Sequence, residues 1–330
     1  MVGRLDERGV SYYGCTSLRH VVEDFKDMIE HGCNAVLLGV SEFDCEFWYR
    51  SMVKIVEAAK WLGLRVYWDF WGWGKVFGGE PPSLFLQRHC KYRQVDRLTN
   101  EPLPAACFNT EEFKSYFWGW VRKVASETDV DGIFLDEPHY YFRGRGWSCA
   151  CPRCRREFKE RYGEEMPKEL NQEVVRFRED KLLEFLKGTA KAVKEADPGK
   201  DVIVCLLPRE DPLVGLINWE EVAKIKEIDC LASDPYWLSC GEPVAKVSEV
   251  ARRVVDIAKR YGKRSQLWLQ AFKVPRGREG ELVEAAKQMI AIGVDSLFAW
   301  CYKGGEGSAI ASEDPLKVWE ILGEIFASIS

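Results

Sequence analysis

Residues Asp131–Pro138 read DGIFLDEP, and this stretch carries the pattern that decides the fold. Its apolar run ends abruptly in two neighbouring carboxylates, Asp136 and Glu137. A strand that is apolar on both faces is typical of a buried parallel sheet, whose working side chains lie at the carboxyl ends of the strands. The stretch therefore predicts a buried strand with a polar, functional end.

Similar apolar runs recur along the chain, and each is followed by a segment with the periodicity of an amphipathic helix. The predicted strands are residues 10–14, 35–40, 65–70, 132–136, 202–207, 230–233, 266–271 and 296–300. The predicted helices are residues 18–30, 47–61, 111–126, 174–196, 219–226, 244–261, 281–292 and 316–325. Eight such repeats in 330 residues predict an α/β fold, a (β/α)8 TIM barrel. The alternative is a doubly wound open sheet, but Gly14–Ser17 lacks the Gly-rich phosphate turn that such sheets usually carry.

Two connections are longer than the short loops typical of these repeats. They span residues 72–109, after the third strand, and residues 139–171, after the fourth. Both leave the carboxyl ends of strands, which is the face where barrels build their active sites. We therefore expect one barrel domain over residues 1–330, with these two excursions forming walls or a lid over a pocket.

The composition narrows the range of partners. A net charge of −5, a pI near 5.7 and the absence of a long Lys/Arg run indicate no binding to nucleic acid or to an anionic membrane. The first residues have no apolar signal core, and no stretch approaches the roughly 18 apolar residues of a membrane span. We expect a cytoplasmic protein, and few Asn and Gln beside many Lys, Glu and Arg point to a thermophilic source.

Side chains just past the strand ends should converge on one pocket. Those residues are polar or aromatic: Trp68, Asp69, Trp71, Asp136, Glu137, His139, Tyr140, Arg209, Glu210, Asp234, Tyr236, Gln270, Trp300 and Tyr302. Aromatic rings stack on the apolar faces of sugars, and carboxylates hold hydroxyls and perform acid–base chemistry on a glycosidic oxygen. The set therefore predicts a carbohydrate-binding pocket.

Asp136 and Glu137 adjoin, so the pleat sends them to opposite sides unless the strand has already ended. We favour Glu137 as the side chain that points into the barrel. Asp136 could instead cap a helix or pair with Arg143, Arg145 or Arg209.

A group of cysteines has the spacing of metal ligands. Three thiols share one short segment: Cys149, Cys151 and Cys154. Cys107, in the preceding excursion, could complete a tetrahedral zinc site, with Cys90 and His89 as alternative fourth ligands. A site of four thiolates is closed, so the zinc would be structural and not catalytic. The alternative is a disulfide or free thiols.

These residues resemble the β-galactosidases of glycoside hydrolase family forty-two, which are retaining (β/α)8 glycosidases. In that family an Asn-Glu pair on strand four carries the acid/base, and a C-x-C-x-x-C motif binds zinc with one upstream cysteine. The resemblance covers mainly residues 105–162. It implies that Glu137 is the acid/base, that the substrate is a carbohydrate, and that copies of the chain associate into a homo-oligomer. It also implies a zinc site made of Cys107, Cys149, Cys151 and Cys154.

The chain departs from this family at two positions. Asp136 replaces the asparagine, and Gln270 stands where the strand-seven nucleophile is expected, although an amide cannot attack. Asp234 or Asp69 could take the second role, as nucleophile or as base. Gln270 could also be an engineered, inactivating change from Glu.

We predict a glycoside hydrolase that uses Glu137 and Asp234 and whose activity is similar to that of a β-galactosidase. The main alternative is a barrel that binds carbohydrate without cleaving it. A metal-dependent hydrolase or isomerase is a further alternative, and it would need histidine ligands. The chain has only four histidines: His20, His31, His89 and His139.

Overall fold

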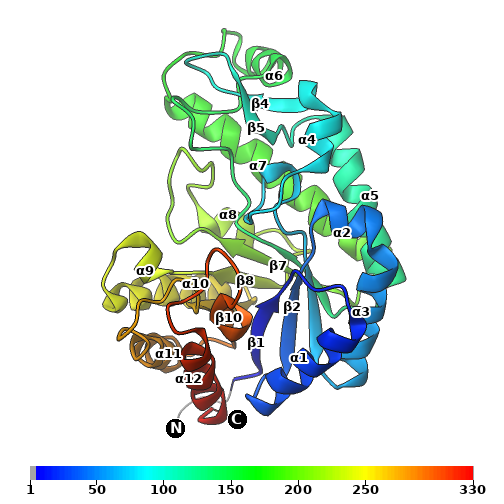
Figure 1. Ribbon diagram of the computed structural model, residues 1–330. Helices are drawn as coiled ribbons and strands as arrows, with labels where there is room; N and C mark the ends of the chain where they lie inside the picture. Colours follow the sequence, from blue (N-terminus) through cyan, green and yellow to red (C-terminus); the bar gives the residue numbers. More distant parts are fainter. Residues whose placement is uncertain (1–4, 330) are drawn as a thin grey trace.

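The computed structural model describes residues 5–329, so the first four residues of the N-terminal stretch lie outside it. Eight parallel strands close into a barrel in chain order, and the last strand pairs with the first (Figure 1). The barrel strands are β1 (Glu7–Tyr12), β2 (Ala35–Gly39), β3 (Arg65–Asp69), β6 (Gly132–Leu135), β7 (Asp201–Leu206), β8 (Cys230–Ser233), β9 (Arg264–Gln270) and β10 (Ser296–Trp300). The predicted (β/α)8 fold is confirmed.

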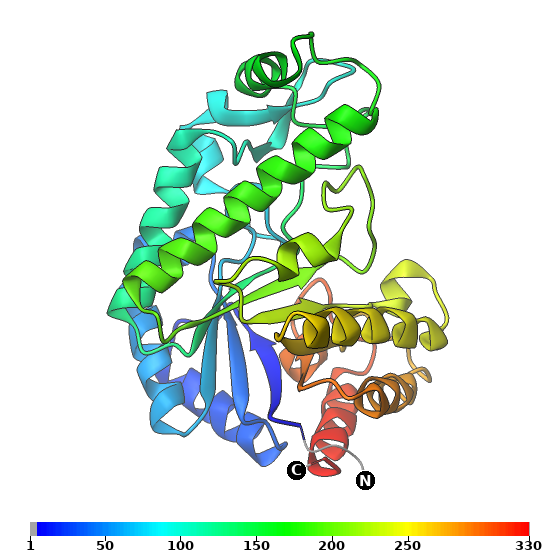
Figure 2. The ribbon, with the colours of Figure 1, turned by 180° about the vertical axis from the view of Figure 1, so that it is seen from behind.

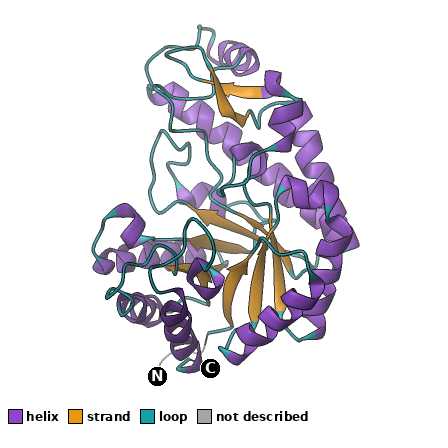
Figure 3. Cartoon of the chain, in the orientation of Figure 1, coloured by secondary structure: helices purple, strands orange, loops and turns teal. Residues whose placement is uncertain are grey.

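Helices surround the barrel (Figures 2 and 3). They are α1 (Leu18–Glu30), α3 (Tyr49–Trp61), α5 (Glu111–Glu127), α7 (Gln172–Ala196), α8 (Trp219–Ala223), α10 (Val247–Arg260), α11 (Glu281–Ile292) and α12 (Pro315–Ala327). Each presents an apolar stripe to the sheet, as α1 does with Val21, Phe25 and Met28, which recur at helical spacing and are fully buried. No helix in the described part of the chain is both long enough and apolar enough to cross a membrane.

The pleat of the strands divides the core into two layers. Tyr67, Phe134, Trp268 and Phe298 fill the barrel interior, where their rings contact one another. Alternate residues such as Trp68 pack outward against the helices. This alternation decides which residues near a strand end can reach the barrel mouth.

The two excursions contain secondary structure of their own and lie together above the barrel in Figure 1. The first holds η1 (Trp73–Lys75), α4 (Leu84–Arg88), η2 (Cys90–Tyr92) and an antiparallel hairpin of β4 (Arg93–Val95) and β5 (Pro102–Ala106). The second holds α6 (Pro152–Tyr162). The remaining short elements are α2 (Glu42–Phe47), α9 (Trp237–Cys240), η3 (Val244–Lys246) and η4 (Tyr302–Gly305).

Candidate active site

Strand β6 ends at Leu135, one residue earlier than predicted, and the chain then turns sharply. Glu137 has a φ of 40°, in the left-handed region that residues other than glycine rarely adopt. A Cβ built on Gly78 would lie 2.3 Å from Oδ2 of Asp136 and 3.2 Å from Oε2 of Glu137. Both carboxylates therefore reach the mouth of the barrel, whereas the pleat alone would have sent them to opposite sides.

Backbone hydrogen bonds hold the first excursion against the end of β6. The N–H of Gly78 donates to the carbonyl oxygen of Asp136 (2.9 Å), and the N–H of His139 donates to that of Val76 (3.0 Å). Only glycine leaves room for the Asp136 carboxylate at position 78, because any Cβ there would clash with it.

Four carboxyl groups from three strand ends form what we call the carboxylate floor: Asp69, Asp136, Glu137 and Asp234. Burial raises the pKa of each group above its ordinary value. The charge of a neighbouring floor carboxylate raises the pKa of Asp69, Asp136 and Asp234 further. The floor therefore retains protons at a pH where exposed carboxylates have lost theirs.

Glu137 and Asp234 lie close enough across the floor for each to affect the pKa of the other. Burial raises the pKa of both groups, and the charge of Glu137 raises that of Asp234 further. Within the described residues, Oδ1 of Asp234 and both carboxyl oxygens of Asp69 have no hydrogen-bond partner. These oxygens are free to accept hydrogen bonds from a ligand.

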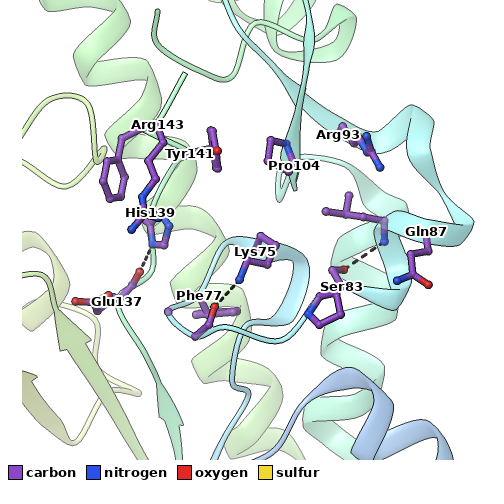
Figure 4. A pocket seen from close by; sticks show the side chains of 15 residues that line it. Lys75, Phe77, Ser83, Gln87, Arg93, Pro104, Glu137, His139, Tyr141 and Arg143 are labelled. Carbon is purple, nitrogen blue, oxygen red and sulfur yellow. Dashed lines mark hydrogen bonds between the residues drawn. The ribbon is translucent and has the colours of Figure 1, made fainter. Parts of the chain in front are cut away.

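A cavity of about 510 Å³ opens beside Glu137 (Figure 4). Three of its lining residues, Lys75, Arg93 and Arg143, form what we call the basic wall. His139 also lines the cavity, and its Nδ1–H donates to the backbone carbonyl oxygen of Glu137 (2.5 Å). Burial lowers the pKa of His139 to about 4, so its imidazole is neutral at pH 7 and its Nε2 is an acceptor.

Aromatic rings gather next to the floor. The ring centroid of Tyr13 lies 4.5 Å from that of Trp71 and 5.5 Å from that of Trp300. Trp71 packs beside Gly79, which lines the cavity. The pKa of Tyr236 is raised by burial and then by the charge of Asp234, which places this ring beside the floor as well. The structure thus brings the predicted Trp71, Trp300 and Tyr236 together with the carboxylates.

Two other predicted aromatic residues do not join this group. Trp68 lies on the outward face of β3, is fully buried, and packs against Tyr49 with a centroid distance of 6.4 Å. The pleat is the reason, since Asp69 is the inward residue of this pair. Tyr140 is buried in the second excursion, where its hydroxyl donates to the carbonyl oxygen of Arg178 (3.1 Å).

Three further predicted residues have partners elsewhere. Glu210 accepts from the N–H of Trp219 (3.0 Å) and so holds the start of α8. The hydroxyl of Tyr302 donates to Oδ2 of Asp27 (2.7 Å) on α1. Arg209 lies exposed at the rim, 5.4 Å above the ring of Phe142, which lines the cavity.

Gln270 is fully buried and its amide is engaged within the barrel wall. Its Nε2 donates to Oγ of Ser239 (2.9 Å) and to the carbonyl oxygen of Phe272 (3.1 Å), and its Oε1 accepts from the N–H of Ser239 (3.1 Å). A carboxylate could not donate to the Phe272 carbonyl oxygen. This position therefore calls for an amide.

The four predicted cysteines come together between the two excursions. The Sγ atoms of Cys107, Cys149, Cys151 and Cys154 all lie within 4.8 Å of one another and are buried. Cys107 lies 3.6 Å from Cys154 and 3.7 Å from Cys151. Zinc–sulfur bonds of about 2.3 Å place the sulfurs of a tetrahedral site about 3.8 Å apart, so the cluster fits such a metal. No described cysteine forms a disulfide.

Sequence reasoning missed the basic wall and the ring of Tyr13. Lys75 and Arg93 belong to the first excursion and Arg143 to the second, so neither strand pattern nor strand-end position marks them. Their shared location in two long connections on the active-site face was the one available signal.

No family model matches the chain, and no curated protein matches its sequence. Solved structures do match. A β-galactosidase from the haloarchaeon Halorubrum lacusprofundi has a TM-score of 0.74 at 16% identity, over 97% of this chain and 58% of its own. A GH42 β-galactosidase from G. stearothermophilus has a TM-score of 0.74 at 15% identity, over 99% and 57%. The chain shares the barrel of these enzymes.

An endo-1,4-β-D-mannanase from Thermotoga petrophila has a TM-score of 0.67 at 12% identity, and here the match covers 99% of this chain and 100% of that one. The chain thus spans just over half the length of the β-galactosidases, and all of the mannanase. At these identities the similarity establishes the fold, and the chemistry has to be argued from the site.

Proposed function

We propose that the chain is a glycoside hydrolase whose reaction is carried by Glu137 and Asp234. The observation that carries this proposal is the cluster of carboxyl groups at three strand ends, in which Glu137 lines an open cavity and has Asp234 as a close neighbour. Glycosidases use two carboxyl groups on either side of the bond that is cleaved. The barrel-sharing β-galactosidases and mannanase are consistent with this chemistry, and a β-galactoside is one candidate substrate.

Glu137 is the general acid in this mechanism. It gives a proton to the leaving oxygen as the bond from that oxygen to the anomeric carbon breaks. The raised pKa of Glu137 keeps this proton on the acid until the substrate binds, and the positive charge that develops at the anomeric carbon favours the ionised form of Asp234. Ionised Asp234 either bonds to the anomeric carbon or takes a proton from the attacking water.

The remaining floor residues bind the sugar. Asp69 has two carboxyl oxygens without partners, and these suit the hydroxyls of a sugar that lies on the floor. Asp136 occupies the place of the asparagine in the family that the sequence resembles. Trp71 and Trp300 supply flat apolar surface next to the floor.

We further propose that Cys107, Cys149, Cys151 and Cys154 hold a structural zinc ion. Such an ion joins the end of the β4–β5 hairpin to the start of α6, so its role is to fix the two excursions. In this reading residues 1–330 form one domain that includes both excursions. A cytoplasmic location, a thermophilic source and association into oligomers stay predictions.

The alternatives are a barrel that binds carbohydrate without cleaving it and a chain inactivated at position 270. The hydrogen bonds of Gln270 argue against an engineered change, because an amide donor is needed there. The binding barrel differs from the hydrolase in a measurable way, since it would retain sugar without releasing product.

The first test is hydrolysis of aryl glycosides of galactose, glucose, mannose and arabinose, in both anomers, with the product anomer followed by NMR. The variants Glu137→Gln and Asp234→Asn are compared on 4-nitrophenyl and 2,4-dinitrophenyl leaving groups. The better leaving group needs no proton, so it should restore most of the activity of Glu137→Gln and little of that of Asp234→Asn. Glu101→Gln, an exposed change in the hairpin turn, is the matched control.

The opposite pattern, with 2,4-dinitrophenyl rescuing Asp234→Asn, would exchange the two roles. Sugar binding without turnover on any glycoside would instead favour the binding barrel.

A further inference from the structure

No residue of the basic wall forms a direct ion pair in the described part of the chain. Lys75, Arg93 and Arg143 come from three separate segments, namely η1, β4 and the loop after β6, and all line the cavity beside Glu137 (Figure 4). The chain has 52 Asp and Glu against 47 Lys and Arg, so acidic groups are in excess. Even so, none of these three cations is within 4.0 Å of a carboxylate oxygen in the described residues.

Arg93 is the clearest case. It is only partly exposed, and its Nε is buried without a hydrogen-bond partner in the described part of the chain. A buried cationic donor without a partner is costly, because it has given up water and gained nothing in return. A native structure retains such a group where a ligand completes its hydrogen bonds.

Lys75 is held in place at some conformational cost. Its φ of 54° is in the left-handed region, so both Lys75 and Glu137 line the cavity from a backbone conformation that disfavours side chains. Its Nζ donates to the backbone carbonyl oxygens of Gly79 and Pro81, which are neutral. Lys75 thus lines the cavity without a direct ion pair in the described residues, although the nearby charge of Glu80 raises its pKa.

Arg143 completes the wall from the other excursion. Its guanidinium lies 5.9 Å from the ring centroid of Phe142 and makes no hydrogen bond or ion pair among residues 5–329. Burial lowers the pKa of Lys75, the charge of Glu80 raises it, and the smaller effect of Arg143 lowers it, so Arg143 is close enough to Lys75 to repel it. An anion between them would relieve that repulsion.

A simpler role for these cations is to balance the carboxylate floor. The charge of Arg143 does lower the pKa of Glu137, against the larger effect of burial. Direct ion pairs would, however, neutralise the floor carboxylates best, and the cations of the basic wall form no such pair with them. Elsewhere the chain forms such pairs readily, as between Lys60 and Asp131 (2.8 Å) and between Arg65 and Glu7 (2.9 Å).

We propose that the basic wall binds an anionic group of the substrate, so that the substrate is an acidic glycoside. The chemistry that the wall recognises is an oxyanion on the sugar, either the carboxylate of a uronic acid or a sulfate ester. The planar guanidinium group of either Arg93 or Arg143 can bind two oxygens of such a group, and Lys75 adds a point charge. Cleavage of this substrate rests on the proposed function, whereas its binding does not.

Binding is measured by calorimetry on Glu137→Gln, which should not consume the ligand. The probes are matched pairs of 4-nitrophenyl glycosides in both anomers: glucuronide with glucoside, galacturonide with galactoside, and 6-sulfated galactoside with galactoside. The acidic member of at least one pair should bind at least about tenfold tighter, and added salt should weaken that preference. Comparison of the uronide and sulfate pairs distinguishes the two sources of charge.

The same pairs are then tested on Arg93→Gln and Arg143→Gln in the Glu137→Gln background. Each change should reduce the preference by about tenfold or more, while binding of the neutral glycosides changes little. Arg145→Gln is the matched control, because this exposed arginine on the same loop does not line the cavity. Arg143 is itself exposed, so its replacement keeps the test valid even if Arg93→Gln unfolds.

Failure of the proposed function and failure of the wall assignment can be distinguished if hydrolysis of the same glycosides by the wild-type chain is also measured. Selective binding of acidic glycosides without hydrolysis would overturn the proposed function and leave the wall assignment standing. Hydrolysis of neutral glycosides, with acidic ones bound no better, would overturn the wall assignment and leave the hydrolase standing. Absence of binding to every probe would also overturn it.

Discussion

The carboxylate floor and the basic wall meet in one cavity, yet they differ in charge and in origin. The residues of the floor lie at the ends of β3, β6 and β8. Strand ends of this kind are part of every (β/α)8 barrel. All three residues of the wall come from the excursions, which are additions to the barrel. Under the two proposals, the strand ends of the barrel carry the reaction and the excursions select the sugar. Each prediction below alters one of the two parts and asks whether the other still works.

The largest effect is expected from the floor alone. Glu137→Gln should lower kcat on natural oligosaccharides by about 10²- to 10⁴-fold, because their poor leaving groups require a proton. Affinity for the ligand, measured by calorimetry, should change little because the wall is intact. A variant with wild-type turnover would remove Glu137 from the mechanism.

The second prediction concerns the basic wall, whose two excursions are joined at the cysteine cluster. Cys151→Ser should lose about one zinc per chain, as measured by elemental analysis, and should lower the melting temperature by about 5 °C or more. KM for an acidic glycoside should rise, while kcat on a neutral one should stay within about twofold. Cys240→Ser, an exposed thiol, is the control. Unchanged metal content and melting temperature would contradict the zinc assignment.

The third prediction asks whether the floor lacks a carboxylate at Gln270. Glu at this position would lose the hydrogen bond to the Phe272 carbonyl oxygen and bring two acceptors together. Gln270→Glu should therefore destabilise the fold by about 1–3 kcal/mol, measured by chemical denaturation, without raising turnover. A gain in activity would reveal a chain inactivated at this position and would move the nucleophile to β9.

The smallest effect concerns the protons on the floor. Burial and the charge of Asp136 raise the pKa of Asp69 in the folded chain above its unfolded value. The contribution of this carboxyl to stability is therefore fully present below about pH 4 and is lost as the pH rises through the folded pKa. Asp69→Asn should melt about 3 °C higher than the wild-type chain at pH 8 and no higher at pH 4, by calorimetry. A constant difference across this range would show that Asp69 is not protonated by its surroundings.

The regular part of the fold could be predicted because periodicity is a local signal. The ranges predicted for β8 and α11 match the structure residue for residue. The hairpin was not predicted, since β4 has only three residues and β5 includes two prolines, which interrupt a strand pattern. Helix α6 was not predicted either, because few of its residues are apolar.

The site divides in the same way. Asp69, Asp136, Glu137 and Asp234 could be found because they follow strand ends, and the cysteines because of their spacing. Trp68 was predicted to line the pocket, but the alternation of the strand directs it outward. Tyr302 was predicted to line the pocket as well, but its hydroxyl bonds to Asp27 on α1. The basic wall could not be predicted, because its members meet only through the packing of two excursions.

The cysteine cluster joins the two excursions that carry the basic wall, so a metal bound there would order the wall before a ligand binds. Cys107 and Cys154 are 47 residues apart, and joining such distant points of a flexible chain costs about 4 kcal/mol of entropy. With zinc bound, that ordering is complete before any sugar arrives, so the wall meets its ligand already arranged. A zinc ion at this cluster would thus act on affinity from a distance, by preorganising a surface that it does not touch.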